Sequence, residues 1–282
     1  MRDWHVAVTG GARGIGREIA RAFAAEGTKV TICDVDGEVA DATAADLGPA
    51  VTARRVDVTD ADAFAAFLDD AESERGPLDV LVNNAGIMPI GPFVDEPDAV
   101  TARTIDIDVR GVLTGTKLAG RRFDRRGRGH VVNIASVMGT MASPNAATYC
   151  AAKYALVGFG QALRQEWRGS GVHITTVCPG FVRTDLIAGM TAGQLMERIA
   201  MVDPDAVATA VLEAVRSGRS GEVFVPKPAA LVSKSTGALP GRIRDALFRL
   251  AGGEKVTDTI DETARAEYRR RVAGPERNGE AL

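Results

Sequence analysis

The segment Thr9-Gly10-Gly11-Ala12-Arg13-Gly14-Ile15-Gly16 decides the fold, because it joins an apolar strand predicted over residues 5–9 to a helix predicted over residues 14–26. Such a turn needs backbone angles and close contacts that a Cβ atom would block. The N–H groups that open the helix can bind a pyrophosphate. A tight turn without a ligand is the simpler interpretation, but this position favours dinucleotide binding. The contacts are expected from Gly10, Arg13, Gly14, Ile15 and Gly16.

Apolar, β-branched runs alternate with helical patterns along the rest of the chain. This alternation is typical of βαβ units with right-handed crossovers, so it predicts an α/β fold with a doubly wound parallel sheet of the Rossmann-like type, covered by helices on both faces. About seven strands are expected, near residues 5–9, 29–33, 51–56, 79–82, 130–134, 172–177 and 222–225. Helices are expected over residues 14–26, 37–47, 60–75, 97–123, 147–169, 184–197 and 204–217.

The composition of the 282-residue chain is ordinary for a globular protein, with 45% hydrophobic and 25% charged residues. A formal net charge of −3 provides no basic field, so no nucleic-acid partner is expected. We expect one domain over residues 1–228, with a substrate lid near 184–203, and a helical C-terminal extension over 229–282. The sequence shows no signal peptide, no transmembrane segment and no zinc or disulfide spacing of its cysteines. A cytoplasmic location and no metal site are therefore expected.

The second predicted strand ends at Asp34, where a dinucleotide-binding fold places the group that contacts the adenosine ribose. A carboxylate accepts hydrogen bonds from both ribose hydroxyls and repels a 2′-phosphate, which favours NAD as the cofactor. Arg13 in the glycine turn could pair with such a phosphate, so NADP is the alternative.

A candidate acid–base pair follows the strand predicted over residues 130–134. That strand leads to Ser136, and the next helix carries Tyr149 and Lys153, whose i and i+4 spacing places them on one helix face. The lysine ammonium would lower the pKa of the phenol, which makes Tyr149 a candidate acid–base. Such a pair alone more often means a half-buried tyrosine beside a solvated lysine. The combination of motifs outweighs that interpretation.

Together these motifs make the chain resemble the short-chain dehydrogenase/reductase superfamily, in its soluble single-domain branch of NAD(P)-dependent oxidoreductases. The resemblance covers most of residues 4–225 and rests on Thr9-Gly10-x-x-x-Gly14-x-Gly16, Asp57-Val58, Asn83-Asn84-Ala85-Gly86, Ser136, Tyr149-x-x-x-Lys153 and Pro179-Gly180. It implies that Asp57 and Val58 hold the adenine. It also implies that Asn83, Asn84, Ala85 and Gly86 support the central strand and touch the cofactor. Further cofactor contacts are implied for Pro179, Gly180, Val182 and Thr184.

The resemblance also implies roles in catalysis. Ser136 would hydrogen-bond the substrate oxygen, and Tyr149 would exchange a proton with it. Lys153 would lower the Tyr149 pKa and bind the nicotinamide ribose. Tyr149 and Lys153 are therefore expected to contact the cofactor as well as the substrate site. Asp108 stands where the family usually carries an asparagine of a proton relay. Because ionised aspartate accepts hydrogen bonds but does not donate them, retuned or reduced activity is expected.

The expected substrate is a small apolar alcohol or ketone, because most residues predicted around the pocket are apolar. They are Met88, Pro89, Ile90, Val137, Met138, Met141, Phe181, Leu186, Ile187 and Met190. Two alternatives stay open: a 3-oxoacyl-thioester reductase that uses NADPH, and a catalytically weak protein that senses the cofactor by binding it.

Partner contacts are expected along the helices over residues 97–123 and 147–169, in a homodimer with a homotetramer as the alternative. The basic amphipathic segment over residues 242–250 is expected to dock on the protein itself. Covering the pocket mouth or peripheral membrane contact are the alternatives for this tail.

Overall fold

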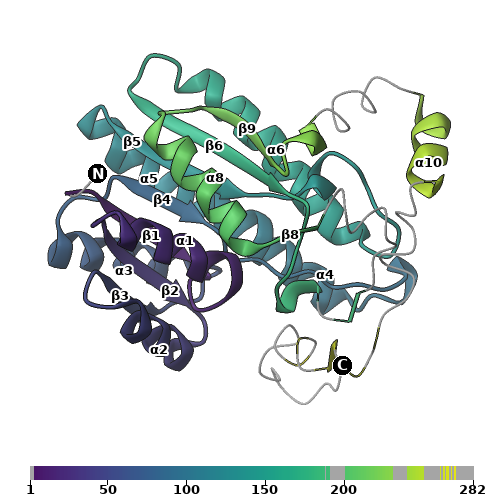
Figure 1. The fold of residues 1–282 in the computed structure, drawn as a ribbon, viewed down its shortest axis with the longest axis horizontal. Helices are drawn as coiled ribbons and strands as arrows, with labels where there is room; N and C mark the ends of the chain where they lie inside the picture. The colour runs from purple at the N-terminus through teal and green to yellow at the C-terminus, as the bar shows by residue number, and fades with distance from the viewer. Residues whose placement is uncertain are drawn as a thin grey trace.

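A computed structural model of the chain describes residues 3–187, 189–190, 201–230 and 240–250, and six residues near the C-terminus: Asp261, Thr263, Arg265, Ala266, Tyr268 and Arg270. Within these ranges, seven parallel strands form one sheet in the order β3-β2-β1-β4-β5-β6-β9 (Figure 1). The strands are β1 (His5–Thr9), β2 (Lys29–Asp34), β3 (Val51–Arg55), β4 (Val80–Asn83), β5 (Gly129–Ile134), β6 (Val172–Pro179) and β9 (Gly221–Val225). The predicted doubly wound parallel sheet is confirmed, and each predicted strand boundary lies within two residues of the observed one.

The central strands are apolar along their whole length because helices cover both faces of the sheet. All five residues of β1 are buried. Successive side chains alternate between the faces, so Val6 and Val8 pack in one core cluster with Ile19. Ala7 packs in a second cluster on the other face, with Phe64.

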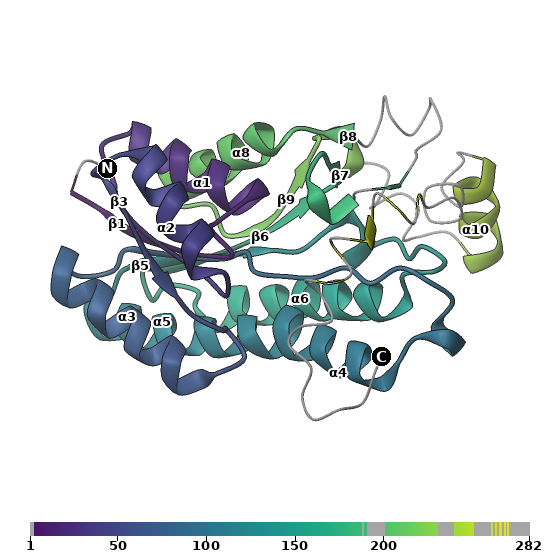
Figure 2. The same cartoon turned by 90° about the horizontal axis from the view of Figure 1, so that it is seen from below.

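Two layers of helices cover the sheet, as Figure 2 shows edge-on. One layer consists of α1 (Gly14–Ala25), α2 (Gly37–Leu47) and α8 (Pro204–Arg216). The opposite layer consists of α3 (Ala61–Arg75), α4 (Asp98–Ile105), α5 (Val112–Arg126) and α6 (Ala147–Glu166). Helix α10 (Gly241–Leu250) lies apart from both layers, at one end of the molecule (Figures 1 and 2).

The helix expected over residues 97–123 is helical throughout from Asp98 to Arg126, but it is not a regular α-helix. Helices α4 and α5 are separated by a π-helical segment, η2 (Asp106–Gly111). Such insertions occur frequently at functional sites. Here the π-helical segment contains Asp108, which is fully buried.

The lid differs from the prediction where the structure describes it. Residues 185–187 form a 3₁₀ turn, η4 (Asp185–Ile187), while most of the helix expected over residues 184–197 lies outside the described residues. A short sheet that was not predicted pairs β7 (Phe181–Val182) with β8 (Met201–Val202). In the tail, α10 is helical, and five of the six described residues from 261 to 270 are helical too. No helix among the described residues has the length and apolar character needed to cross a membrane.

Candidate active site

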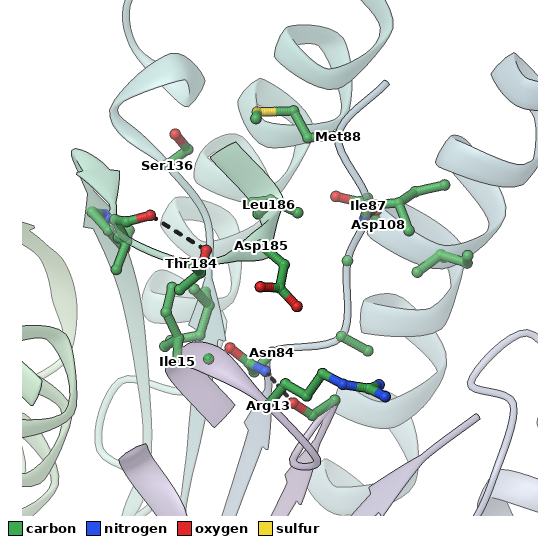
Figure 3. A pocket seen from close by; sticks show the side chains of 18 of the residues that line it. Arg13, Ile15, Asn84, Ile87, Met88, Asp108, Ser136, Thr184, Asp185 and Leu186 are labelled. Atoms are coloured by element: carbon green, nitrogen blue, oxygen red, sulfur yellow. Dashed lines mark hydrogen bonds between the residues drawn. The ribbon is translucent and has the colours of Figure 1, made fainter. Parts of the chain in front are cut away.

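A cavity of about 730 Å³ opens at the carboxyl ends of the strands. It lies where β1 and β4 are neighbours and the order of the strands reverses, the position at which doubly wound sheets bind ligands. In Figure 3, Arg13 lies at one end of the cavity, and Ser136 and Met88 lie toward the other, with Asp185 and Leu186 between them. The cavity therefore extends from the glycine turn to Ser136 along the sheet edge.

Most residues expected at the site line this cavity. They are Gly10, Arg13, Gly14, Ile15, Asp34, Asp57, Val58, Ala85, Gly86, Asp108, Ser136, Tyr149, Lys153, Pro179, Gly180, Val182 and Thr184. Gly16 does not line it but packs beneath the turn, where an added Cβ would lie 2.1 Å from the Gly10 carbonyl oxygen. Among the expected site residues, Gly16 and Asn83 do not line the cavity.

Asn83 is not placed to contact a ligand, contrary to expectation. Its side chain is buried, and its Nδ2 donates hydrogen bonds to Asn133 Oδ1 at 2.9 Å and Thr116 Oγ1 at 3.1 Å. Asn83 therefore ties β4 to β5 and α5. The next residue, Asn84, lines the cavity, and its Nδ2 donates to the carbonyl oxygens of Thr9 and Gly10 at 3.0 and 2.9 Å.

The glycine turn is built for a negatively charged ligand. Gly10 has φ +62°, and a Cβ there would lie 2.8 Å from the Ala85 Cα atom. Among the described residues, no side chain caps the start of α1 and no acidic residue lies in its first turn. The N–H groups of that turn and the positive end of the helix dipole therefore suit a phosphate group. The cavity thus fits a dinucleotide cofactor, with its phosphates at the start of α1.

Two carboxylates lie beyond the glycine turn. Asp34 Oδ2 accepts a hydrogen bond from the Ala12 N–H at 3.2 Å, and Asp34 Oδ1 accepts one from the Asp36 N–H at 3.2 Å. Asp36 also lines the cavity and pairs with the Arg13 guanidinium at 2.8 Å. Sequence reasoning missed Asp36, because an aspartate just before a helix indicates an ordinary N-cap, a role it also performs toward Val39.

Ser136, Tyr149, Lys153 and Asp108 come together at the other end of the cavity. Lys153 Nζ lies 3.0 Å from Asp108 Oδ2 and donates a hydrogen bond to the Ile134 carbonyl oxygen at 3.2 Å. Its ammonium also lies 5.3 Å from the centre of the Tyr149 ring. Asp108 Oδ1 accepts a hydrogen bond from the Ile87 N–H at 2.8 Å. The π-helical segment thus places a carboxylate directly against the lysine.

The pKa values of Tyr149, Lys153 and Asp108 differ from the expectation that the lysine lowers the pKa of the tyrosine. The pKa of Tyr149 lies above its ordinary value, mainly because the phenol is buried. Lys153 and a hydrogen bond with Ser136 lower this pKa, and the Asp108 carboxylate raises it. The predicted lowering by Lys153 exists, but burial outweighs it. Burial lowers the pKa of Lys153, but Asp108 and Tyr149 together raise it above its usual range. Burial also raises the pKa of Asp108, against the effect of Lys153. The 3.0 Å contact and the Ile87 hydrogen bond favour a carboxylate paired with an ammonium.

Apolar side chains also surround Tyr149, apart from Ser136, Lys153 and Asp108. Met88, Met138, Tyr149 and Phe181 belong to one buried cluster, with Leu186 packed against it. Six of the apolar residues predicted around the pocket line the cavity: Met88, Val137, Met138, Phe181, Leu186 and Ile187. Pro89, Ile90, Met141 and Met190 do not line it.

Tyr268 also lines the cavity, a position that nothing in the sequence indicated.

Within the described ranges, no group of three histidine, cysteine, aspartate or glutamate side chains is arranged to hold a metal ion.

Comparison with known proteins agrees with this architecture. The family model of the short chain dehydrogenases matches residues 4–195. "Probable oxidoreductase EphD" of Mycobacterium tuberculosis is 35% identical over 262 residues, which cover 86% of this chain and 44% of the relative. The chain therefore spans less than half the length of that relative.

Two further proteins are similar over most of their own length. "Galactitol 2-dehydrogenase (L-tagatose-forming)" of Cereibacter sphaeroides is 39% identical over 187 residues, or 65% of this chain and 73% of the relative. A crystal structure of actinorhodin polyketide ketoreductase with NADPH superposes with a TM-score of 0.72 at 30% identity, covering 80% of this chain and 97% of that one. The matched residues and the shared fold show that the chain belongs to the short-chain dehydrogenase/reductase family.

Proposed function

We propose that the protein is an NAD(H)-dependent oxidoreductase that interconverts an apolar alcohol and its ketone or aldehyde. The observation that carries the proposal is the cluster of Ser136, Tyr149 and Lys153 at one end of a cavity whose other end is a glycine turn. Family membership supports oxidoreductase chemistry. A nicotinamide cofactor bound in this cavity would supply the acceptor or donor of a hydride.

The residues at the site can each perform a defined task in that chemistry. In alcohol oxidation, the Ser136 hydroxyl would hydrogen-bond the substrate oxygen, and the Tyr149 phenolate would take its proton. In carbonyl reduction, the neutral phenol would return the proton to the same oxygen. The Lys153 ammonium favours the phenolate electrostatically, and Asp108 fixes that ammonium in place.

The phosphates of the cofactor would be held by the first turn of α1, at Gly14 and Ile15. Asp34 would accept hydrogen bonds from the ribose hydroxyls. NAD is favoured because a 2′-phosphate near Asp34 and Asp36 would meet two carboxylates. Arg13, which could have bound such a phosphate, is already paired with Asp36.

A ketoreductase that uses NADPH is the second candidate. It is favoured by the fold shared with a polyketide ketoreductase whose structure contains NADPH. The carboxylates of Asp34 and Asp36 argue against it.

An apolar substrate is favoured by the side chains beside Tyr149. The relative named for galactitol acts on a polyol, whereas the cavity here has Met88, Met138 and Phe181 next to the phenol. Apolar side chains offer no hydrogen bonds to the many hydroxyls of a sugar alcohol, so a carbinol with apolar substituents fits better.

The test is the absorbance of reduced nicotinamide, followed with NAD and with NADP over a panel of cyclic and aliphatic alcohols and ketones, with galactitol included. We expect turnover with NAD, and higher kcat/KM for the apolar alcohols than for galactitol. Turnover of ketones with NADPH alone would establish the second candidate. Tight binding of NADH without turnover of any substrate would instead indicate a protein that senses the cofactor.

A further inference from the structure

The C-terminal segment reaches the cavity from far along the sequence. The Met88 N–H donates a hydrogen bond to the Tyr268 hydroxyl oxygen at 2.6 Å, across a separation of 180 residues. Arg265 Nη2 donates to the carbonyl oxygen of the same Met88 at 2.6 Å. Both backbone polar groups of Met88 are therefore bound by the tail.

The same segment also binds the loop after β7. Arg265 Nη1 donates to the Leu186 carbonyl oxygen at 3.2 Å, and the Asp261 N–H donates to the Gly189 carbonyl oxygen at 2.8 Å. Gly189 has φ +77°, and a Cβ there would lie 2.5 Å from the Asp261 carbonyl oxygen. Glycine thus permits the close approach of the two segments. The tail connects the two loops, at Met88 and at Leu186, that flank the cavity.

The contact is buried and well matched. Arg265 is 1% exposed and Tyr268 is 8% exposed, whereas the described neighbours Thr263, Ala266 and Arg270 are exposed. The three-residue spacing places Arg265 and Tyr268 on one helix face, and the guanidinium lies 4.8 Å from the centre of the Tyr268 ring. A buried guanidinium is unfavourable unless its donors are satisfied, and here two of them reach backbone carbonyl oxygens.

Tyr268 is part of the cavity that holds Ser136, Tyr149 and Asp108. Burial raises the pKa of the Tyr268 phenol, which is therefore neutral at physiological pH, and Asp108 and Tyr149 lie near enough to raise it further. The ring thus adds an aromatic surface to the apolar side of the site, beside Met88 and Leu186.

We propose that the described C-terminal residues Asp261, Arg265 and Tyr268 form one wall of the substrate pocket and that Tyr268 limits the size of the alcohol or ketone that reaches Tyr149. Arg265 holds this wall against Met88 and Leu186. The inference rests on the proposed function, since it assigns the substrate to the Tyr149 end of the cavity. Compact apolar substrates fit beside the Tyr268 ring, and removal of the ring makes room for larger ones.

The test compares the unmodified protein with Tyr268→Ala, Tyr268→Phe and the exposed control Thr263→Ala. Binding of cyclohexanone and cyclododecanone to the NADH-loaded protein is measured by calorimetry, and reduction of both ketones is measured by absorbance. We expect Tyr268→Ala to change the affinity ratio in favour of the larger ketone by roughly tenfold, the discrimination that small changes in an apolar pocket produce. Tyr268→Phe keeps the ring and should keep the ratio, as should Thr263→Ala.

The proposed wall would be refuted if Tyr268→Ala left the ratio of the two ketone affinities unchanged. It would also be refuted if none of these proteins bound either ketone. If the affinity ratio changes as expected but neither ketone is reduced, the role of Tyr268 in the pocket is supported and the proposed redox function is refuted. Should Tyr268→Ala fail to fold, Tyr268→Leu removes the aromatic ring with a smaller loss of volume, and the same change of ratio is expected.

Discussion

Asp34 and Asp36 are the residues on which the cofactor preference rests. Both line the cavity, and Asp36 engages the guanidinium of Arg13 at 2.8 Å. The sequence alone left Arg13 as a possible partner for a 2′-phosphate. In the structure, that guanidinium is paired with a carboxylate, which is one reason for proposing NAD.

Asp34→Ser should relax this preference. The change removes one negative charge facing the ribose, so the ratio of the NADPH to the NADH dissociation constant should fall by about tenfold or more, since like charges brought together cost several kcal/mol. Titration of protein fluorescence with both reduced cofactors measures the ratio. Asp70→Ser, at an exposed aspartate of α3 that does not line the cavity, serves as the control and should leave the ratio unchanged. Equal or tighter binding of NADPH by the unmodified protein would contradict the assignment.

Asp108 gives a second prediction at this scale, because its carboxylate raises the pKa of Tyr149. Asp108→Asn removes that charge and keeps an oxygen that can accept a hydrogen bond from the Lys153 ammonium, so the phenol should ionise at lower pH. Alcohol oxidation needs the phenolate, and kcat/KM should therefore rise with pH through a midpoint that lies lower than in the unmodified protein. Asp106→Asn, in the same π-helical segment but paired with Arg110 at the surface, should leave the profile unchanged. A midpoint that stays in place or rises in Asp108→Asn would refute this role.

At the scale of elements, the strands could be predicted because buried parallel strands are continuous β-branched runs bounded by turns. The π-helical segment η2 could not, since its apolar spacing does not differ from that of an α-helix over one turn. The β7–β8 pair could not be predicted either, because two-residue strands carry no alternating pattern. These two features shape the site, where local geometry departs from regular periodicity.

The tight turn at the start of α1 should not tolerate a side chain at Gly16. An added Cβ would lie 2.1 Å from the Gly10 carbonyl oxygen and 2.6 Å from Asn84 Nδ2. Gly16→Ala should therefore displace the turn and weaken NADH binding at least about tenfold, because the close backbone approach is lost. Gly158→Ala in α6 is the matched control, since no atom lies within 4 Å of its added Cβ. Thermal unfolding of that control should show gained stability of about 1 kcal/mol or less. Unchanged NADH affinity in Gly16→Ala would count against the turn as the phosphate site.

At the scale of the whole molecule, residues near the carboxyl edge of the sheet were predictable, since motif order and topology bring them together. Asn83 was expected both to support the central strand and to touch the cofactor; its amide is used inside the protein, toward Asn133 and Thr116, and it does not line the cavity. Tyr268 could not be found, because its contact with Met88 depends on how the tail folds back over the domain. The expected homodimer and cytoplasmic location stay predictions.

The central claim is that Tyr149 exchanges the substrate proton, and the most direct test is Tyr149→Phe. Turnover of the best alcohol found with NAD is followed by absorbance, and NADH binding by fluorescence titration. We predict that kcat falls at least about 100-fold, as expected for loss of a general acid–base, while NADH affinity changes little. Tyr154→Phe, at the half-exposed tyrosine of the same helix, should keep full activity. Near wild-type turnover in Tyr149→Phe would contradict the account.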